Sequence, residues 1–153
     1  MNSFFRGFII FLSTGAFSGY APVMPGTVGS VAGVALYFLL SSFSVPIYLL
    51  LTVLFISLSI WSSGKAAQLF KEKDPPEIVI DEIAGYLVTM ATFLPDWRYI
   101  IAGFILFRIM DILKPYPANW INDKVQGGLG IVLDDVVAGI YANLILQTVR
   151  VLV

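Results

Sequence analysis

The residues from Pro46 to Trp61 read PIYLLLTVLFISLSIW and contain no charged side chain. With its flanks, this run reaches the ~20 apolar residues that an α-helix needs to cross the hydrocarbon core of a bilayer. In the whole chain, 58% of the residues are hydrophobic, 12% are charged and the mean hydropathy is +0.88. A soluble domain of this composition would expose large apolar patches. The sequence therefore predicts an integral membrane protein.

Further apolar segments lie on both sides of this run. Residues 28–40 form a short membrane helix that ends in the polar cluster SSFS before Pro46. Residues 134–153 form a final apolar helix that is long enough to cross. At the start, the apolar run of residues 7–12 is short, and the SGYAPVMPGT that follows is typical of a loop that feeds a helix. We therefore expect the start to stay in the mature protein and not to be a signal peptide.

Two shorter helices are predicted between these segments. Residues 81–94 and 99–113 are joined by PDWR, a connection short enough to make them an antiparallel hairpin. Each would be ~21 to 23 Å long, which is short of a full span. We therefore expect an all-α membrane bundle of short and full-length helices, in a single domain over residues 1–153.

Two polar connections carry all five lysines of the chain. The first, SSGKAAQLFKEKDPPE, ends in two prolines that forbid helix continuation, and the second is KPYPANWINDKVQGGLG. By the positive-inside rule, this clustering places both connections in the cytoplasm. The lysines concerned are Lys65, Lys71, Lys73, Lys114 and Lys124.

This topology brings acidic residues to one face of the membrane. The hairpin starts and ends inside, the final helix starts inside, and so does the helix that follows the turn PGTVGS. Two basic residues, Arg108 and Lys114, come to the same face. The carboxylates that converge at these cytoplasmic helix ends are Asp81, Glu82, Asp111, Asp134 and Asp135.

Five carboxylates at membrane depth need cations, because ionisable groups are costly there unless they pair. The chain has no cysteine and no histidine, so thiolate and imidazole ligands are excluded. Mg²⁺ or Mn²⁺, which prefer oxygen ligands, are the natural counter-ions. Capping of a helix N-terminus could instead explain either acidic pair alone. However, DEIAG and DDVVAG each place a small Ala-Gly step one turn on, where another helix backbone can approach closely.

The segment FRIMDILKP places Arg108, Asp111 and Lys114 at successive i, i+3 positions. They could form a structural ladder of ion pairs, or the two cations could bind a phosphate beside the metal. Thr27 and Ser30 in PGTVGS could likewise belong to a helix cap or to a phosphate site. The glycine loop VQGGLG is either a plain connector or a lid.

Taken together, GYAPVMPGTVGS, IDEIAG, FRIMDILKPYP and GGLGIVLDDVVAG resemble the phosphatidylglycerophosphatase A family of the bacterial inner membrane, over nearly the whole chain. The resemblance implies an all-helical fold and Mg²⁺-dependent conversion of phosphatidylglycerol phosphate to phosphatidylglycerol at the cytoplasmic surface. The expected partners are this phospholipid and the membrane, with no nucleic acid. Members often carry a histidine where this chain has Gln126, so a histidine there is not essential to the chemistry.

The resemblance also implies site residues. It assigns catalysis and metal binding to Asp81, Glu82, Asp111, Asp134 and Asp135. It assigns phosphate binding to Arg108, Lys114, Thr27 and Ser30. We expect a metal-activated water to attack phosphorus, and an aspartyl-phosphate intermediate is the alternative.

Three other functions fit some of the same residues. A cation channel or transporter would distribute its acids through the depth of the membrane. A CDP-alcohol phosphotransferase would carry a long DGxxAR…GxxxDxxxD pattern, which this sequence lacks. In a purely structural helix bundle, the arrangement of Arg108, Asp111 and Lys114 would have no function.

Overall fold

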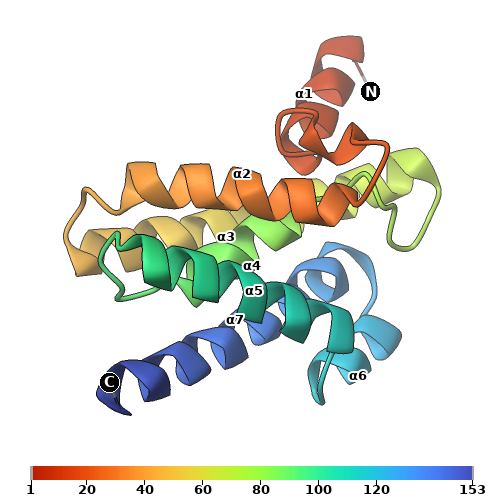
Figure 1. Cartoon of the computed structure of the whole chain (residues 1–153). Helices are drawn as coiled ribbons and strands as arrows, with labels where there is room; N and C mark the ends of the chain where they lie inside the picture. Colours follow the sequence, from red (N-terminus) through yellow and green to blue (C-terminus); the bar gives the residue numbers. More distant parts are fainter. Residues whose placement is uncertain (1, 153) are drawn as a thin grey trace.

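The computed structural model describes residues 2–152, and all of its regular elements are helical (Figure 1). This part of the chain contains seven α-helices, one short 3₁₀ helix and no strand, which confirms the predicted all-α class. The elements in chain order are α1 (Ser3–Ser13), η1 (Ser18–Tyr20), α2 (Pro25–Leu40), α3 (Val45–Phe70), α4 (Ile80–Thr89), α5 (Trp97–Leu113), α6 (Ala118–Lys124) and α7 (Gly127–Leu152).

The helices α2, α3, α4, α5 and α7 run along one another in alternating directions (Figure 1). The starts of α2, α4 and α7 and the ends of α3 and α5 lie at the same end of this bundle, together with α1 and α6. The structure therefore brings together the helix ends that the sequence predicted to share one face. We call this end of the molecule the polar end.

Two helices are long and apolar enough to cross a membrane. α3 and α7 have 26 residues each, about 39 Å at 1.5 Å per residue, and their apolar windows have mean hydropathies of 2.0 and 1.8. The predicted span from Pro46 to Trp61 lies within α3. Only 22% of the α3 window is buried inside the protein, and large side chains such as Leu50 and Val53 are exposed. This exposure is compatible with a lipid surround.

Several helix boundaries differ from the sequence prediction. α3 continues to Phe70, through the first half of the connection expected at residues 62–77, because nothing interrupts it before Lys71, which ends it with a left-handed φ of 59°. α1 is a helix for which the sequence made no prediction, and the Asn2 side chain caps it by accepting a hydrogen bond from the Phe4 amide at 3.2 Å.

The expected loop at residues 114–130 also contains helix. α6 occupies its middle, and α7 begins at Gly127, about two turns before the predicted start at Asp134. The glycines in the first turn of α7 let this helix pack directly on α3. A Cβ on Gly128 would collide with the backbone carbonyl of Ile60. Close packing thus keeps a glycine-rich segment helical that propensity alone assigns to a loop.

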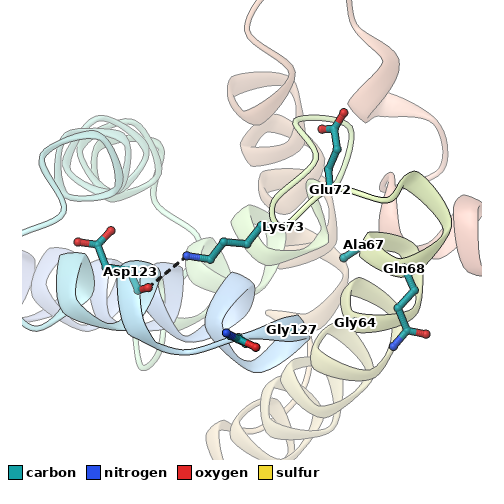
Figure 2. Close-up of a pocket in the computed structure, with 8 residues that line it drawn as sticks. Gly64, Ala67, Gln68, Glu72, Lys73, Asp123 and Gly127 are labelled. Carbon is teal, nitrogen blue, oxygen red and sulfur yellow. Dashed lines mark hydrogen bonds between the residues drawn. The ribbon is translucent and has the colours of Figure 1, made fainter.

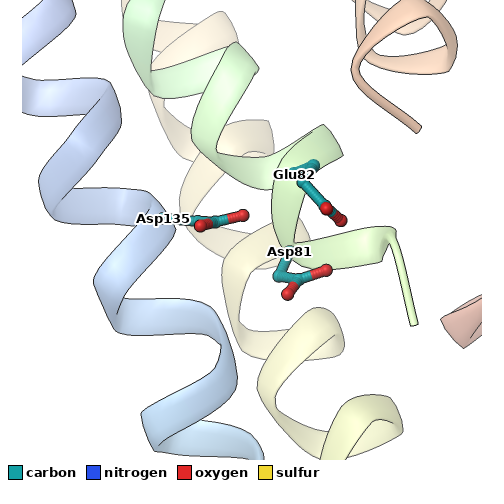
Figure 3. Close-up of side chains that lie close together, drawn as sticks. All are labelled: Asp81, Glu82 and Asp135. Carbon is teal, nitrogen blue, oxygen red and sulfur yellow. The ribbon is translucent and has the colours of Figure 1, made fainter. Parts of the chain in front are cut away.

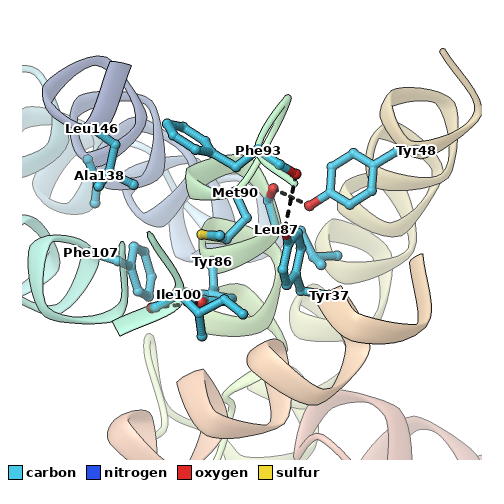
Figure 4. Packing of buried hydrophobic residues seen from close by; sticks show 11 residues of the cluster. Tyr37, Tyr48, Tyr86, Leu87, Met90, Phe93, Ile100, Phe107, Ala138 and Leu146 are labelled. Atoms are coloured by element: carbon cyan, nitrogen blue, oxygen red, sulfur yellow. Dashed lines mark hydrogen bonds between the residues drawn. The ribbon is translucent and has the colours of Figure 1, made fainter. Parts of the chain in front are cut away.

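α4 has only ten residues and ends inside the bundle. Its core neighbours form a cluster at the end opposite the polar end, centred on Tyr37, Tyr48 and Tyr86 (Figure 4). The Tyr48 hydroxyl donates a hydrogen bond to the Leu87 carbonyl at 2.7 Å, and Tyr37 donates to the Phe93 carbonyl at 3.0 Å. Backbone groups left free where the short helix ends are therefore paired with side chains, as an apolar surround requires.

α4 packs closely on α7 through glycines. A Cβ on Gly139 would collide with the Gly85 carbonyl, and a Cβ on Gly85 would come within 2.7 Å of the Asp135 carbonyl oxygen. These glycines are the small residues of the two Ala-Gly steps in the sequence. The close approach they allow places Asp135 of α7 beside the first turn of α4.

Candidate functional site: a carboxylate cluster at the polar end

A pocket of about 350 Å³ opens at the polar end between the starts of α2 and α4, the end of α5 and α7. The chain segments Met24–Gly26 and Asp74–Pro76 form part of its wall. Seven of its lining residues are charged: Asp74, Asp81, Glu82, Arg108, Asp111, Lys114 and Asp135. Six of these seven were predicted from the sequence.

Asp81, Glu82 and Asp135 form the tightest group in this pocket. Each offers a carboxylate oxygen, and the three oxygens lie within 4.8 Å of one another (Figure 3). Asp81 is 7% exposed and Asp135 is 3% exposed. Asp81 Oδ1, Glu82 Oε2 and Asp135 Oδ2 are buried and have no hydrogen-bond partner within residues 2–152. Three carboxylates this close together, each with a buried oxygen that lacks a donor, could hold a cation.

Helix capping does not account for these acids. Asp134 and Asp135 lie about two turns inside α7, beyond the turn in which a carboxylate can cap the helix. Asp81 and Glu82 are in the first turn of α4, where the helix dipole favours negative charge, but the N-cap residue of α4 is Val79. The dipole therefore helps to hold two acids at the start of α4 and leaves their oxygens free.

Arg108 lies on α5 and faces two of the acids. Its Nη1 atom is 2.6 Å from Asp111 Oδ2, one turn further along the helix, and 3.9 Å from Glu82 Oε1. The same nitrogen donates a long hydrogen bond of 3.4 Å to the Ser30 hydroxyl. Arg108 is thus fixed from α2, α4 and α5, with its guanidinium in the wall of the pocket.

Lys114 ends α5 and pairs with Asp134 and not with Asp111. Its amine also donates a 3.4 Å hydrogen bond to Asn122 Oδ1. Burial lowers the pKa of Lys114, but the hydrogen bond and the charge of Asp134 outweigh burial, so the pKa is raised overall and the amine stays charged. The predicted ladder of three residues is therefore split into two separate ion pairs.

Asp134 has a different environment from its neighbour. It is 3% exposed, one oxygen pairs with Lys114, and the other accepts a hydrogen bond from the Asp135 amide at 3.1 Å. It does not belong to the pocket lining or to the group of three clustered acids. In this structure Asp134 supports Lys114, which does line the pocket.

Thr27 and Ser30 lie in the first two turns of α2, within a helix and not in a preceding loop. The Ser30 hydroxyl donates to the Gly26 carbonyl at 2.9 Å and accepts from Arg108. The Thr27 hydroxyl is buried without a partner in the described part of the chain. Neither side chain lines the pocket, so their contact with phosphate stays a prediction.

Asp74 is the charged residue of the pocket that the sequence reasoning missed. It is exposed at the rim, directly before Pro75 and Pro76. Partial desolvation raises the pKa of Asp74, and the charges of Lys114 and Lys73 oppose this rise. An acid followed by two prolines in a charged loop was the signal available, since prolines fix the backbone that carries it.

A larger hollow of about 510 Å³ lies between the end of α3 and the start of α7 (Figure 2). Its lysine, Lys73, is already engaged, because its amine donates hydrogen bonds to the carbonyls of Asn122 at 2.6 Å and Asp123 at 3.3 Å. These bonds attach the connection after α3 to α6. The hollow therefore has a structural cross-link and lacks a cluster of carboxylates like that of Figure 3 among the described residues.

The sequence matches a family model described as phosphatidylglycerophosphatase A over residues 11–150. A phosphatidylglycerophosphatase A of Escherichia coli K12 is 38% identical over 130 residues, which cover 84% of this chain and 76% of the relative. One of Haemophilus influenzae is 38% identical over 142 residues, 91% of this chain and 86% of the relative. A Bacteroides thetaiotaomicron protein with the provisional name phosphatidylinositol-3-phosphatase is 36% identical and covers 92% of each chain. No solved structure matches this chain.

Proposed function

The chain belongs to the phosphatidylglycerophosphatase A family, and on this basis we propose that it converts phosphatidylglycerol phosphate to phosphatidylglycerol and inorganic phosphate. It is an enzyme of the phosphoric monoester hydrolase class. The reaction breaks the bond between phosphorus and the terminal glycerol oxygen, and water supplies the oxygen that leaves with the phosphate.

Dependence on Mg²⁺ is part of this proposal. The observation that carries it is the set of three buried, unpartnered oxygens on Asp81, Glu82 and Asp135, counted over residues 2–152. Carboxylate oxygens are the ligands that Mg²⁺ prefers, and one ion of charge +2 would offset most of the three negative charges. When bound, Mg²⁺ supplies charge that orients the phosphate and lowers the pKa of a water molecule.

Arg108 and Lys114 would bind the phosphate beside the clustered carboxylates. Both are already held by carboxylates of the protein, so little further ordering is needed when the substrate arrives. The guanidinium presents two parallel donors to phosphate oxygens, and the ammonium acts as a point charge. In a phosphoryl transfer such cations stabilise the charge that develops on the equatorial oxygens.

We favour water as the nucleophile, because the three clustered carboxylates would be occupied with the cation. The alternative is attack by a carboxylate to give an aspartyl phosphate. Rapid acid quench during turnover distinguishes the two mechanisms. Trapping of a phosphorylated protein would refute direct attack by water.

The proposed location is the cytoplasmic face of the bacterial inner membrane. Lys65, Lys71 and Lys73 belong to the polar end, as do the acids of the pocket, and the positive-inside rule assigns such an end to the cytoplasm. A channel or transporter is disfavoured, because the charged residues of the pocket gather at one end and do not continue along the bundle.

The direct test is phosphate release by the purified protein from phosphatidylglycerol phosphate, with Mg²⁺ or with a chelator. We expect release only with Mg²⁺, and a loss of at least about a hundredfold in Asp111→Asn and Asp135→Asn. Asp123→Asn, an exposed acid outside the pocket, is the matched control. Phosphatidylinositol 3-phosphate tests the head group suggested by the Bacteroides relative. No release from either lipid would refute the proposed function.

A further inference from the structure

An apolar groove of about 230 Å³ lies between α1, α2, α3 and α4. Its lining side chains are apolar. They include Leu12 and Ala16 near the end of α1, Ala32 and Leu36 of α2, Phe55 of α3 and Ile83 of α4. At about 30 Å³ for a group the size of a water molecule, the groove has room for roughly eight methylene groups.

The groove owes its space to small residues and to an unusual turn. Gly15, Ala16 and Phe17 have φ values of 53°, 54° and 70°, so three consecutive residues are left-handed after α1. The turn brings the ring of Phe17 against Phe11, with centroids 5.5 Å apart, and both rings are exposed. Phe17 also stacks on the exposed Tyr20, with centroids 6.3 Å apart, and tyrosine is typical of the membrane interface.

The groove and the carboxylate pocket share the same two helices as walls. On α4, Ile83 faces the groove, whereas Glu82 directly before it faces the pocket. On α2, Ala32 faces the groove, whereas Gly26 lines the pocket. The groove and the pocket therefore lie on different faces of the same two helices.

A third hollow adjoins the carboxylate pocket at the polar end. It measures about 300 Å³ and is lined by the η1 turn from Gly19 to Pro22 and by Glu77. Pro25 and Pro76 line both this hollow and the carboxylate pocket. At its other side, η1 continues from Gly15 and Ala16, which line the groove. The single chain segment 15–26 thus lines the groove, the hollow and the carboxylate pocket in turn.

We propose that the groove holds an acyl chain of the lipid whose phosphate occupies the carboxylate pocket. The proposal rests on the proposed function. A phospholipid has its phosphate and its chains at opposite ends, and the segment 15–26 lines the groove at its start and the carboxylate pocket at its end. Lipid tails are as apolar as these side chains, so the groove adds little binding free energy inside a bilayer. Its effect is to fix the orientation of the phosphate in the pocket.

Filling the groove tests this role. Ala32→Phe places a ring in it, and Ala35→Phe places the same ring on an exposed position of α2 outside it. Phosphate release is measured in mixed micelles for phosphatidylglycerol phosphates with chains of 4 to about 18 carbons. We expect Ala32→Phe to lower kcat/KM for the longest chains by roughly tenfold to hundredfold and to leave the shortest substrate within about twofold of the wild type.

Two outcomes would overturn the proposal: equal profiles for Ala32→Phe and Ala35→Phe, or an equal loss at every chain length in Ala32→Phe. A photoreactive group near the end of an acyl chain adds a readout that does not depend on turnover. It should label α2 or α4 in the wild type and lose this labelling in Ala32→Phe. If the wild type releases phosphate from none of the lipids, the proposed function fails, which is a distinct result.

Discussion

Asp134 and Asp135 are adjacent in the sequence but have different surroundings. Asp135 joins Asp81 and Glu82 and keeps one buried oxygen without a partner in the described chain, whereas both oxygens of Asp134 are engaged. Because side chains i and i+1 point about 100° apart on a helix, only one of the two can face α4. We infer that Asp135 is a metal ligand and that Asp134 positions Lys114.

The two asparagine variants at these positions should therefore behave differently. Asp135→Asn removes a ligand charge and should raise the Mg²⁺ concentration for half-maximal phosphate release by roughly 10- to 100-fold or more. Asp134→Asn should leave that concentration within about twofold and raise KM for the lipid, because Lys114 loses its fixed partner. Mg²⁺ titrations of phosphate release measure both. An equal shift in the two variants would contradict this assignment.

Gly26 controls the position of two site residues. A Cβ at this position would collide with Glu82 Oε1 and lie 3.2 Å from Arg108 Nη1. We expect Gly26→Ala to lower kcat/KM by roughly tenfold to hundredfold, since a shift of about 1 Å in a catalytic group has this effect. Gly7→Ala is the control, because a Cβ there meets no described atom within 4 Å. Unchanged activity in Gly26→Ala would contradict this expectation and show that Glu82 and Arg108 tolerate displacement.

At the residue scale, the sequence predicted six of the seven charged side chains that line the pocket but not how they pair. Topology was sufficient to bring Arg108, Lys114 and the acids to one end. The spacing of Arg108, Asp111 and Lys114 also predicted their shared helix. That spacing could not reveal that Lys114 pairs with Asp134, because the pair depends on where α7 begins and how it packs.

At the scale of elements, α4 is the central feature of the bundle. It is short, it carries Asp81 and Glu82 at its start, and its C-terminal end lies in the apolar core. Asn143 of α7 binds that end with two hydrogen bonds, from Nδ2 to the Thr89 carbonyl at 2.8 Å and to the Ala91 carbonyl at 2.9 Å. These bonds fix the depth of α4 and thereby the height of its acids.

Asn143→Leu should destabilise the protein, although it substitutes no residue of the carboxylate pocket. Two carbonyls would lose their partner, and measured values for such bonds in membrane proteins suggest a total cost of about 1–3 kcal/mol. Thr148→Val on the same helix is the control, because its exposed hydroxyl bonds only within α7 and should count for less than about 0.5 kcal/mol. Unfolding by denaturant in detergent micelles measures both. Equal stabilities for the two variants would contradict the role of Asn143.

The sequence predicted a helix correctly where local composition determines it. It did not predict a helix boundary that depends on packing against another helix. The uncharged run after Pro46 predicted the core of α3. The start of α7 could not be predicted, because glycines at residues 127, 128 and 130 favour a loop. Only the packing of α3 against this segment explains why it is helical. The apolar groove depends on four helices and a left-handed turn, so no local pattern indicates it.

At the scale of the whole molecule, the two ends of the bundle differ in charge. The polar end carries the acids of the pocket together with the lysines of the connection after α3. The opposite end carries the connection between α4 and α5, with exposed apolar residues such as Leu94. This asymmetry is the basis of the proposed orientation, with the polar end in the cytoplasm.

Cysteine labelling in intact cells tests this orientation, and the chain has no cysteine of its own. Glu72→Cys places a thiol at the polar end, and Leu94→Cys places one at the opposite end; both positions are exposed. A membrane-impermeant maleimide should label Leu94→Cys from outside and Glu72→Cys only in inverted vesicles. The reverse pattern would place the carboxylate pocket outside the cytoplasm.

Binding of a divalent cation by the three clustered carboxylates is the central claim, and Mn²⁺ titration followed by electron paramagnetic resonance tests it most directly. In detergent, the purified protein should bind about one or two Mn²⁺ ions per chain and release them to excess Mg²⁺. Asp135→Asn should lose this binding and keep its helical structure, and Asp123→Asn should bind as the wild type does. Absence of binding in the wild type, or equal binding in Asp135→Asn, would contradict the claim.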